Sequence, residues 1–313
     1  MLALGVDIGG TKIGAGVVDD EGRILAQTRV PTDAVEVANI DRAVARAYHE
    51  LAEAYPIERV GVAAAGFVSS DRRTMSFAPN IAWRDYPLAE RIEALIGGVS
   101  VVVENDANAA GWAEFRFGAA RHAEHMLMIT LGTGLGGAVV TDGRLLRGWA
   151  GVAAEIGHMR VVPHGHVCGC GREGCWEQYA AGSALVREAR AAAIRRPDEA
   201  VALVERSGGS IDAITGPVVT LAAQEGDPFA VELLADLGRW VGEGAAAVAA
   251  LLDPQIVVIG GGVSAAGDLV LAPARRAFLE QLSGRGHRPE AELAIAEMGN
   301  EAGIVGAADL ARI

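Results

Sequence analysis

The strongest constraint on the fold is an internal repeat of a glycine-containing hairpin. The segment IGGTKIGAGVVDDEGRIL at residues 8–25 aligns, with one deletion, with TLGTGLGGAVVTDGRLL at residues 130–146, so that Gly10 meets Gly132. Each copy has the pattern of strand, glycine turn, strand, turn and strand. A unit that recurs in this way predicts two related lobes, the alternative being chance similarity between glycine-rich hairpins.

The hydrophobic pattern outside the repeat predicts an α/β chain, with a loop around Pro79, Trp83 and Pro87 that has no regular structure. The predicted strands are Leu2–Asp7, Ile13–Val18, Arg23–Arg29, Arg59–Ala64, Val99–Val103, Gln255–Ile259 and Glu292–Glu297. The predicted helices are Val37–Leu51, Leu88–Ile96, one that starts close behind Asp106, Gly182–Ile194, Asp198–Arg206, Val218–Glu225, Pro228–Leu252, Asp268–Gln281 and Glu301–Ile313.

Composition excludes several classes of protein. The chain has 313 residues, of which 51% are hydrophobic and 21% charged, as is typical of a globular protein. Its net charge of -13 disfavours a surface for nucleic acid or anionic membrane. Met1 leads directly into a strand instead of a secretory signal, and the apolar segment Gly244–Leu252 is too short to cross a bilayer. We therefore expect a cytoplasmic protein without a nucleic-acid or membrane partner.

All three cysteines of the chain lie within one short loop. Cys168, Cys170 and Cys175 follow His158, and the loop between them is rich in glycine. This spacing is too cramped for a disulfide framework, whereas three thiolates and one imidazole complete a tetrahedral zinc shell with no open position. The sequence therefore predicts a structural zinc site, with reduced, half-buried cysteines as the alternative.

Two acidic residues flank the predicted zinc ligands. Glu155 precedes His158 by three residues, so the two side chains share a face if this segment is helical, and Glu177 follows the last cysteine by two. A metal loop that orders carboxylates can build a polar binding site. The alternative is a pair of solvated surface glutamates.

Three glycine turns each follow an apolar strand, at residues 9–12, 132–137 and 260–262. Exposed backbone amides in such turns bind anions, and glycine allows a phosphate to approach closely. The turns lack the spacing of a Rossmann or Walker A loop, but together they indicate a nucleotide, with its phosphates at the first two. Lys12, the only lysine of the chain, is either a phosphate contact or a solvated loop tip.

Asp106 is the carboxylate that we select as a catalytic base. It follows a buried strand, at the edge where open α/β sheets bind their ligands, and it is adjacent to Asn105. The alternative is that Asn105 or Asp106 only caps the following helix.

Four of these motifs together resemble the ROK family of sugar kinases and related repressors, with the nearest likeness to its bacterial ATP-dependent glucokinases. They are DIGGTK at 7–12, LGTGLGG at 131–137, EIGH at 155–158 and CGCGREGCWE at 168–177. The resemblance implies a duplicated α/β fold of the actin-like, hexokinase-like (ribonuclease H-like) type, with two lobes, an interlobe cleft and a structural zinc loop. We accordingly expect a small domain of residues 1–118 and 301–313 and a large domain of residues 119–300.

The resemblance also implies ATP-dependent phosphorylation of glucose at its 6-hydroxyl, with Mg²⁺ accompanying ATP. It makes Asp106 the base and assigns glucose to Gly66, Asn80, Asn105, Asp106, Glu155, His158 and Glu177. It assigns ATP to Asp7, Gly9, Gly10, Thr11, Lys12, Thr133, Gly134, Gly261 and Gly262, with Asp7 near the magnesium through water. It assigns zinc to His158, Cys168, Cys170 and Cys175. Because Ala65 stands where the family often has proline, the contact at Gly66 is the least secure of these.

Other functions compete with glucose phosphorylation. A kinase for fructose or N-acetylmannosamine is barely separable by sequence. A sugar-responsive repressor of the same family carries a DNA-binding segment before its first glycine loop, which here begins at residue 7. A chaperone-type ATPase of the same fold would leave the zinc loop unexplained. We expect a homo-oligomer, either a dimer or a tetramer, which binds glucose and ATP.

Overall fold

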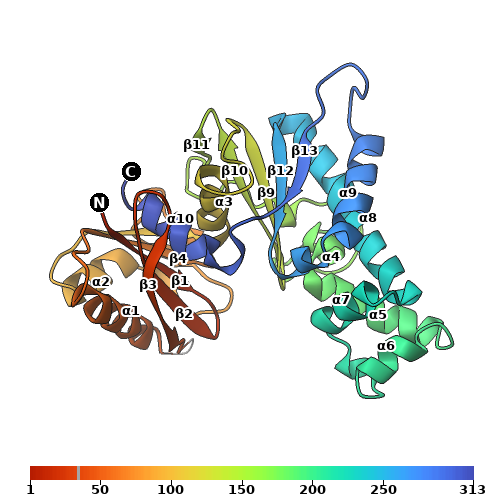
Figure 1. The fold of residues 1–313 in the computed structure, drawn as a ribbon, viewed down its shortest axis with the longest axis horizontal. Coiled ribbons are helices and arrows are strands. Elements are labelled where there is room, and N and C mark those ends of the chain that lie inside the picture. Colours follow the sequence, from red (N-terminus) through yellow and green to blue (C-terminus); the bar gives the residue numbers. More distant parts are fainter. Residues whose placement is uncertain (34–35) are drawn as a thin grey trace. The chain divides into compact units, whose positions relative to one another are not determined.

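A computed structural model describes residues 1–33 and 36–313, which form two compact units (Figure 1). Unit 1 consists of Met1–Glu124, Ala138–Ala154 and Glu297–Ile313. Unit 2 consists of His125–Gly137 and Glu155–Ala296. The functional domain limits that we derived from the sequence stay a prediction.

The central sheet of unit 1 combines antiparallel and parallel pairing. Its described strands have the order β3 (Ile24–Pro31), β2 (Lys12–Val18), β1 (Ala3–Ile8), β4 (Arg59–Ala64) and β8 (Val101–Asn105). β1 pairs antiparallel with β2 and parallel with β4, which in turn pairs parallel with β8. Because β1, β4 and β8 are parallel, the residues that follow each of them lie at the same edge of the sheet.

A second sheet repeats this order. Its described strands run β11 (Arg144–Leu145), β10 (Leu135–Thr141), β9 (Met126–Leu131), β12 (Ile256–Gly260) and β13 (Glu292–Ile295). The hairpin strands β9, β10 and β11 correspond to β1, β2 and β3, and β9 has β12 as its parallel neighbour just as β1 has β4. The duplication predicted from the two glycine hairpins is therefore confirmed at the level of topology.

Helices cover both faces of the first sheet. Leu4, Val6 and Ile8 of β1 pack with residues of α1 (Val37–Ala52) and α2 (Leu88–Leu95). On the opposite face, Ala3 and Val18 pack with α3 (Asp106–Arg116) and α10 (Ala302–Leu310). The alternation of side chains along a strand explains why β1 serves both cores.

Two glycines allow α10 to lie directly against the sheet. A Cβ added to Gly5 of β1 would lie 1.8 Å from the carbonyl oxygen of Ile304, and one added to Gly61 of β4 would lie 1.8 Å from that of Ala307. The backbones of α10 and the two strands are therefore in contact at these positions, and no other residue type fits.

We expect Gly61→Ala to destabilise the protein by at least about 1 to 3 kcal/mol, because the new methyl group would force α10 away from β4. Denaturant unfolding of the variant measures this loss. The control is Gly216→Ala at the start of α7 (Gly216–Gln224), where an added Cβ meets nothing within 4 Å. Equal midpoints for wild type and Gly61→Ala would show that the helix does not rest on the sheet in this way.

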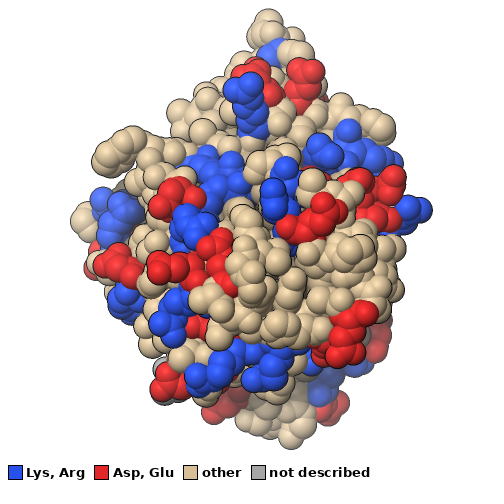
Figure 2. Space-filling model, turned by 90° about the vertical axis from the view of Figure 1, so that its left-hand side faces the viewer, with Lys and Arg blue, Asp and Glu red and all other residues tan. Residues whose placement is uncertain are grey.

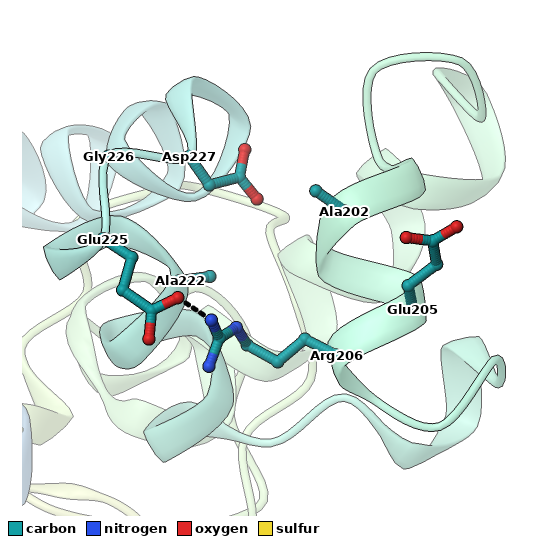
Figure 3. Close-up of a pocket in the computed structure, with 7 residues that line it drawn as sticks. All are labelled: Ala202, Glu205, Arg206, Ala222, Glu225, Gly226 and Asp227. Atoms are coloured by element: carbon teal, nitrogen blue, oxygen red, sulfur yellow. Dashed lines mark ion pairs between the residues drawn. The ribbon is translucent and has the colours of Figure 1, made fainter.

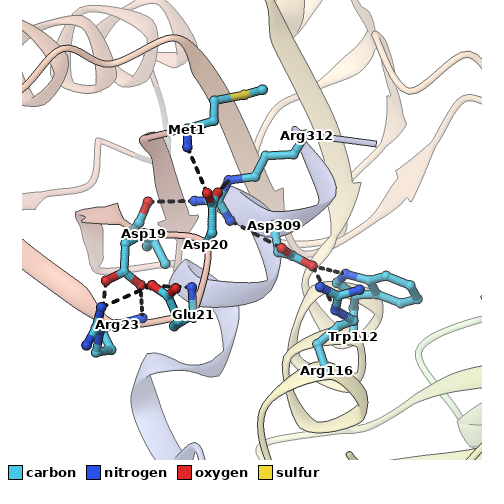
Figure 4. Close-up of polar contacts among 10 residues, drawn as sticks. Met1, Asp19, Asp20, Glu21, Arg23, Trp112, Arg116, Asp309 and Arg312 are labelled. Atoms are coloured by element: carbon cyan, nitrogen blue, oxygen red, sulfur yellow. Dashed lines mark hydrogen bonds and ion pairs between the residues drawn. The ribbon is translucent and has the colours of Figure 1, made fainter.

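Polar side chains tie α10 to its neighbours (Figure 4). The buried Asp309 carboxylate accepts a hydrogen bond of 2.8 Å from the Trp112 indole and is 3.4 Å from Nε of Arg116, both on α3. Arg312 donates to Asp309 at 3.2 Å and to the carbonyl of Val18 at 2.5 Å. These bonds hold α10 and the residues that follow it to α3 and to the end of β2.

Unit 2 contains the zinc-loop region and a group of helices. Its longest helix, α8 (Pro228–Leu252), packs along α9 (Asp268–Gln281) (Figure 1). The packing is close because the backbone of α9 approaches Gly238 and Gly242 of α8. The helices are α4 (Glu177–Ala180), α5 (Gly182–Arg195), α6 (Val201–Arg206), α7, α8 (Pro228–Leu252) and α9 (Asp268–Gln281). The four 3-10 segments of the described chain are Ile156–His158, Ile211–Ala213, Gly262–Ala266 and Gly299–Glu301.

One sequence prediction was wrong. The loop around Pro79, Trp83 and Pro87 is not wholly irregular, because it includes part of a small sheet. This sheet has the order β5 (Phe67–Val68), β6 (Met75–Phe77) and β7 (Arg84–Tyr86). Strands of two or three residues show no measurable periodicity in sequence, so only their pairing reveals them.

The surface of the described residues carries charges of both signs. Figure 2 shows Lys and Arg interspersed with Asp and Glu on the face that it draws. Among residues 1–33 and 36–313, none of the helices has both the length and the apolar character needed to pass through a membrane.

Candidate functional site

The four predicted zinc ligands converge in unit 2. The donor atoms of His158, Cys168, Cys170 and Cys175 all lie within 4.8 Å of one another. Nδ1 of His158 is 3.7 Å from Sγ of Cys168, and Sγ of Cys170 is 3.6 Å from Sγ of Cys175. Turns with positive φ at Gly171 and Gly174 fold the loop back, as expected for glycine.

The distances of 3.7 and 3.6 Å fit a tetrahedral metal ion. With Zn–S bonds of about 2.3 Å and Zn–N bonds of about 2.0 to 2.1 Å, the ligand atoms of a zinc site stand about 3.5 to 3.8 Å apart. The pKa of Cys168 is raised, first by burial, and that of Cys175 is raised for the same first reason. Burial disfavours the charged thiolate and so produces this effect, and a bound metal would reverse it.

Both predicted sugar carboxylates lie beside this cluster along the chain. Glu177 begins α4, and its Oε1 accepts from Sγ of Cys168 at 3.0 Å and lies 3.9 Å from Nδ1 of His158. Glu155 precedes the 3-10 segment Ile156–His158 and is exposed. The backbone N–H of His158 donates to the carbonyl of Glu155 at 3.1 Å, while a shared face of the two side chains stays a prediction.

Two of the three glycine turns meet within unit 2. The carbonyls of Gly132 and Thr133 accept from the backbone N–H groups of Gly182 and Ser183 at the start of α5, at 2.8 and 3.3 Å. A Cβ on Gly261 would lie 2.6 Å from the carbonyl oxygen of Leu131. The turn at 132–137 is thereby held against both α5 and the turn at 260–262.

The same turn also approaches a predicted sugar ligand. A Cβ added to Gly134 would lie 2.9 Å from Oε2 of Glu177. Thr133, Gly134, Gly261 and Gly262 are all exposed, so their backbone remains accessible to a ligand. The predicted phosphate turn and the carboxylate after the zinc loop are thus neighbours.

The first glycine turn lies in unit 1. The N–H of Gly9 donates to the carbonyl of Lys12 at 3.0 Å, which closes the turn between β1 and β2. Gly10, Thr11 and Lys12 are exposed. An exposed tip agrees with both interpretations of Lys12, a phosphate contact or a solvated side chain.

The negative charge of Asp106, which follows β8, acts on Asp7 near the end of β1. Burial first, and the negative charge of Asp106 second, raise the pKa of Asp7 to about 6, while Lys12 lowers it. Burial also raises the pKa of Asp106. A cation at this place would favour the ionised form of Asp7, which burial and the neighbouring charge disfavour.

Asn105 and Asp106 have distinct local roles. The side chain of Asn105 caps α3 by accepting from the backbone N–H of Asn108 at 3.0 Å. Its Nδ2 donates to the carbonyl of Gly66 at 3.1 Å, so two predicted sugar ligands are in contact. Asp106 is the first residue of the helix and does not supply this cap. The capping alternative therefore applies to Asn105, and Asp106 remains available for chemistry.

The last two predicted sugar residues, Gly66 and Asn80, lie in segments next to strands of the small sheet. Gly66 has φ of 138°, and a Cβ there would lie 2.3 Å from the carbonyl oxygen of Phe77, so glycine is required. Asn80 is exposed in the segment between β6 and β7. Unit 1 thus brings Gly66 and Asn105 together and leaves Asn80 accessible near the same sheet.

A cavity of about 570 Å³ lies elsewhere in unit 2, between α6, α7 and the start of α8. Figure 3 shows Arg206 reaching from α6 to pair with Glu225 beyond α7. Its lining residues include none that the sequence assigns to a ligand. This cavity is therefore separate from the predicted sugar and nucleotide residues.

Comparisons with known proteins agree with the resemblance. The model of the ROK family matches residues 3–313. A glucokinase of Streptomyces coelicolor is 50% identical over 311 residues, covering 99% of this chain and 98% of that protein.

Solved structures give the same result. A ROK family glucokinase from Streptomyces griseus, in complex with glucose and AMPPNP, is 51% identical and covers 100% of this chain and 99% of its own, with a TM-score of 0.90. A ROK hexokinase from Thermus thermophilus is 36% identical and covers 100% of this chain and 98% of its own, with a TM-score of 0.81.

Proposed function

The chain belongs to the ROK family, and from this premise we propose that it transfers the γ-phosphoryl group of ATP to the 6-hydroxyl of glucose. The products are glucose 6-phosphate and ADP. The observation that carries this proposal is the sequence identity of 50% and 51% to two glucokinases over almost the whole chain. The presence of glucose and an ATP analogue in one of these relatives supports the choice of both substrates.

Asp106 acts as the base in this proposal. As the bond between O6 of glucose and the γ-phosphorus forms, the bond from that phosphorus to the leaving oxygen of ADP breaks, and the proton of O6 passes to the Asp106 carboxylate. Phosphoryl transfer depends more on alignment and charge neutralisation than on a strong nucleophile. A carboxylate that orients the hydroxyl and accepts its proton late meets this need.

Sugar selectivity comes from side chains that bond to hydroxyl groups. Each buried polar group that a wrong sugar leaves unpaired costs about 1 to 3 kcal/mol, so several such groups discriminate strongly. The proposed ligands are Gly66, Asn80 and Asn105 of unit 1 and Glu155, His158 and Glu177 of unit 2.

The glycine turns bind the nucleotide. Gly9, Gly10, Thr11 and Lys12 in unit 1 and Thr133 and Gly134 in unit 2 contact the phosphates, and Gly261 and Gly262 border the adenosine. Exposure of both phosphate turns supports this assignment, because their backbone N–H groups can face an anion.

Mg²⁺ accompanies ATP and neutralises phosphate charge. Asp7 holds the ion through water. Burial first, and the negative charge of Asp106 second, raise the pKa of Asp7 to about 6, which supports a cation at this place.

Zinc has a structural role in this proposal. Its four ligands are His158, Cys168, Cys170 and Cys175, and their close approach supports it. The metal fixes the loop that carries His158 and Glu177, and it takes no part in the transfer itself.

A cytoplasmic location and assembly into a dimer or tetramer complete the proposal, and both rest on the sequence alone.

A substrate panel tests the proposed reaction. We expect ADP release with ATP and Mg²⁺ to give the highest kcat/KM for glucose among glucose, fructose, mannose and N-acetylmannosamine, with glucose 6-phosphate as the product identified by ³¹P NMR. Preference for another hexose would reassign the substrate. Phosphorylation of none of these sugars, with either ATP or polyphosphate as donor, would contradict a kinase function.

A further inference from the structure

A buried carboxylate lies directly beside the proposed base. Glu104 is only 3% exposed and is the penultimate residue of β8. Its Oε1 accepts from the backbone N–H of Asn105 at 3.2 Å and from Nδ2 of Asn108 at 3.1 Å. One oxygen of Glu104 therefore holds both the end of the strand and the first turn of α3, on either side of Asp106.

The second oxygen of Glu104 faces two guanidinium groups. Nε of Arg147 donates to Oε2 at 2.8 Å, and Nε of Arg72 lies 3.5 Å from the same atom. The Arg side chains are 26% and 16% exposed, so this cluster is largely removed from water. Burial, followed by repulsion from Arg147, lowers the pKa of Arg72 to about 10. Glu104 is thus the carboxylate that holds two like charges together.

Arg72 connects this cluster to the small sheet. It lies between β5 and β6, with φ of 61°, and its carbonyl accepts from the N–H of Val103 on β8 at 2.9 Å. Its Nη2 donates to the carbonyl of Leu310 at 2.8 Å. The β5–β6 hairpin begins after Gly66 and ends before Asn80, so Arg72 fastens the segment that carries two proposed sugar ligands.

Arg147 connects the cluster to a second segment. The carbonyl of Arg147 accepts from the N–H of Ala153 at 3.0 Å, which closes a short loop. A Cβ on Gly151 would lie 2.2 Å from the carbonyl oxygen of Val68, so this loop rests on β5. The chain continues from this loop directly to Glu155, another proposed sugar ligand.

We propose that Glu104 and Arg147 are positioning residues for glucose phosphorylation, because their ion pair with Arg72 fastens the three segments of unit 1 that carry or lead to the sugar ligands. This inference rests on the proposed function. It concerns residues that the sequence pattern did not select. Glu104 directly follows the strand predicted at Val99–Val103, so no pattern in the sequence marks it, and it touches no substrate in our proposal.

The test compares Arg147→Met and Glu104→Gln with a buried ion pair of the same unit. Asp41 of α1 is 1% exposed and receives Nε of Arg91 of α2 at 2.7 Å, which makes Asp41→Asn a matched loss of a buried, Arg-paired carboxylate. We expect all three variants to lower the unfolding midpoint. Only Arg147→Met and Glu104→Gln should raise the glucose KM, by about tenfold or more, since small displacements of positioned groups cost this much. The ATP KM should change little.

A double variant separates positioning from general damage. If the two residues act as one unit, Arg147→Met should add little to the glucose KM once Glu104→Gln is present. If Glu104→Gln does not fold, the glucose KM of Arg147→Met, compared with that of Asp41→Asn, still tests the positioning role.

The outcomes distinguish this inference from the proposed function. A wild-type protein that phosphorylates no hexose overturns both. An active wild type whose Arg147→Met variant keeps its glucose KM, or whose Asp41→Asn variant raises it equally, overturns the positioning role alone.

Discussion

Asp106→Asn is expected to lower kcat by about 10²- to 10⁴-fold, the usual contribution of a positioned general base. The amide has the same shape and can still bond to a sugar hydroxyl, but it cannot accept the proton of O6. Glucose binding, measured by calorimetry, should therefore persist while steady-state turnover is lost. Because the side-chain cap of α3 comes from Asn105, the substitution leaves that cap in place.

The matched control is Asp268→Asn. Asp268 is also an acidic first residue of a helix, in this case α9, and it is exposed. Its replacement should leave kcat unchanged, which separates loss of the base from loss of a charge at a helix start. Turnover by Asp106→Asn close to that of the wild type would remove Asp106 from the role of base.

The raised pKa of Asp106 also predicts how Asp106→Asn changes stability and how activity depends on pH. In the folded protein burial raises the pKa above its ordinary value of 3.8, so the ionised carboxylate costs stability at every pH above that value. Asp106→Asn removes this cost and should keep or raise the unfolding midpoint at neutral pH. In the wild type, kcat/KM should fall as the pH decreases. The midpoint of this fall should lie at a higher pH than it would for an aspartate of ordinary pKa. A destabilised variant would show that Asp106 serves the fold.

The fold could be predicted from the sequence wherever a pattern repeats. Strand β4 and helices α8 and α9 lie at their predicted bounds, because long apolar periodicities and clear end signals define them. The duplicated hairpin predicted two related lobes, and the two five-stranded sheets have the same strand order. The sheet β5–β6–β7 was missed, since its strands of two or three residues exist only through pairing and through contacts such as Gly66 against Phe77.

The site could be predicted only as far as its residues belong to local motifs. The convergence of His158 with the three cysteines follows from one short loop and was confirmed. The cluster of Glu104, Arg72 and Arg147 joins three segments that are distant in sequence, and no spacing in the sequence predicts it. Its members are recognisable only by burial and by their shared oxygen atom, which are properties of the folded chain.

Cys175→Ser is expected to release the proposed zinc, lower the unfolding midpoint and raise the glucose KM by about 10- to 100-fold, with little change in the ATP KM. Cys175 is fully buried and is not a proposed sugar ligand, so its loss acts on glucose only through the loop that holds His158 and Glu177. The control is His164→Ala, because the side chain of His164 is 88% exposed in the same loop and belongs to no ligand set.

Metal analysis decides between a structural zinc and a cluster of reduced thiols. We expect about one zinc per wild-type and His164→Ala chain and almost none per Cys175→Ser chain, because three ligands hold a structural ion poorly. A strong chelator should reproduce the effect of Cys175→Ser in the wild type, and added zinc should restore glucose affinity there but not in the variant. Full activity in metal-free wild-type protein would contradict the proposed role, since the carboxylate of Glu177 would then keep its place without the ion.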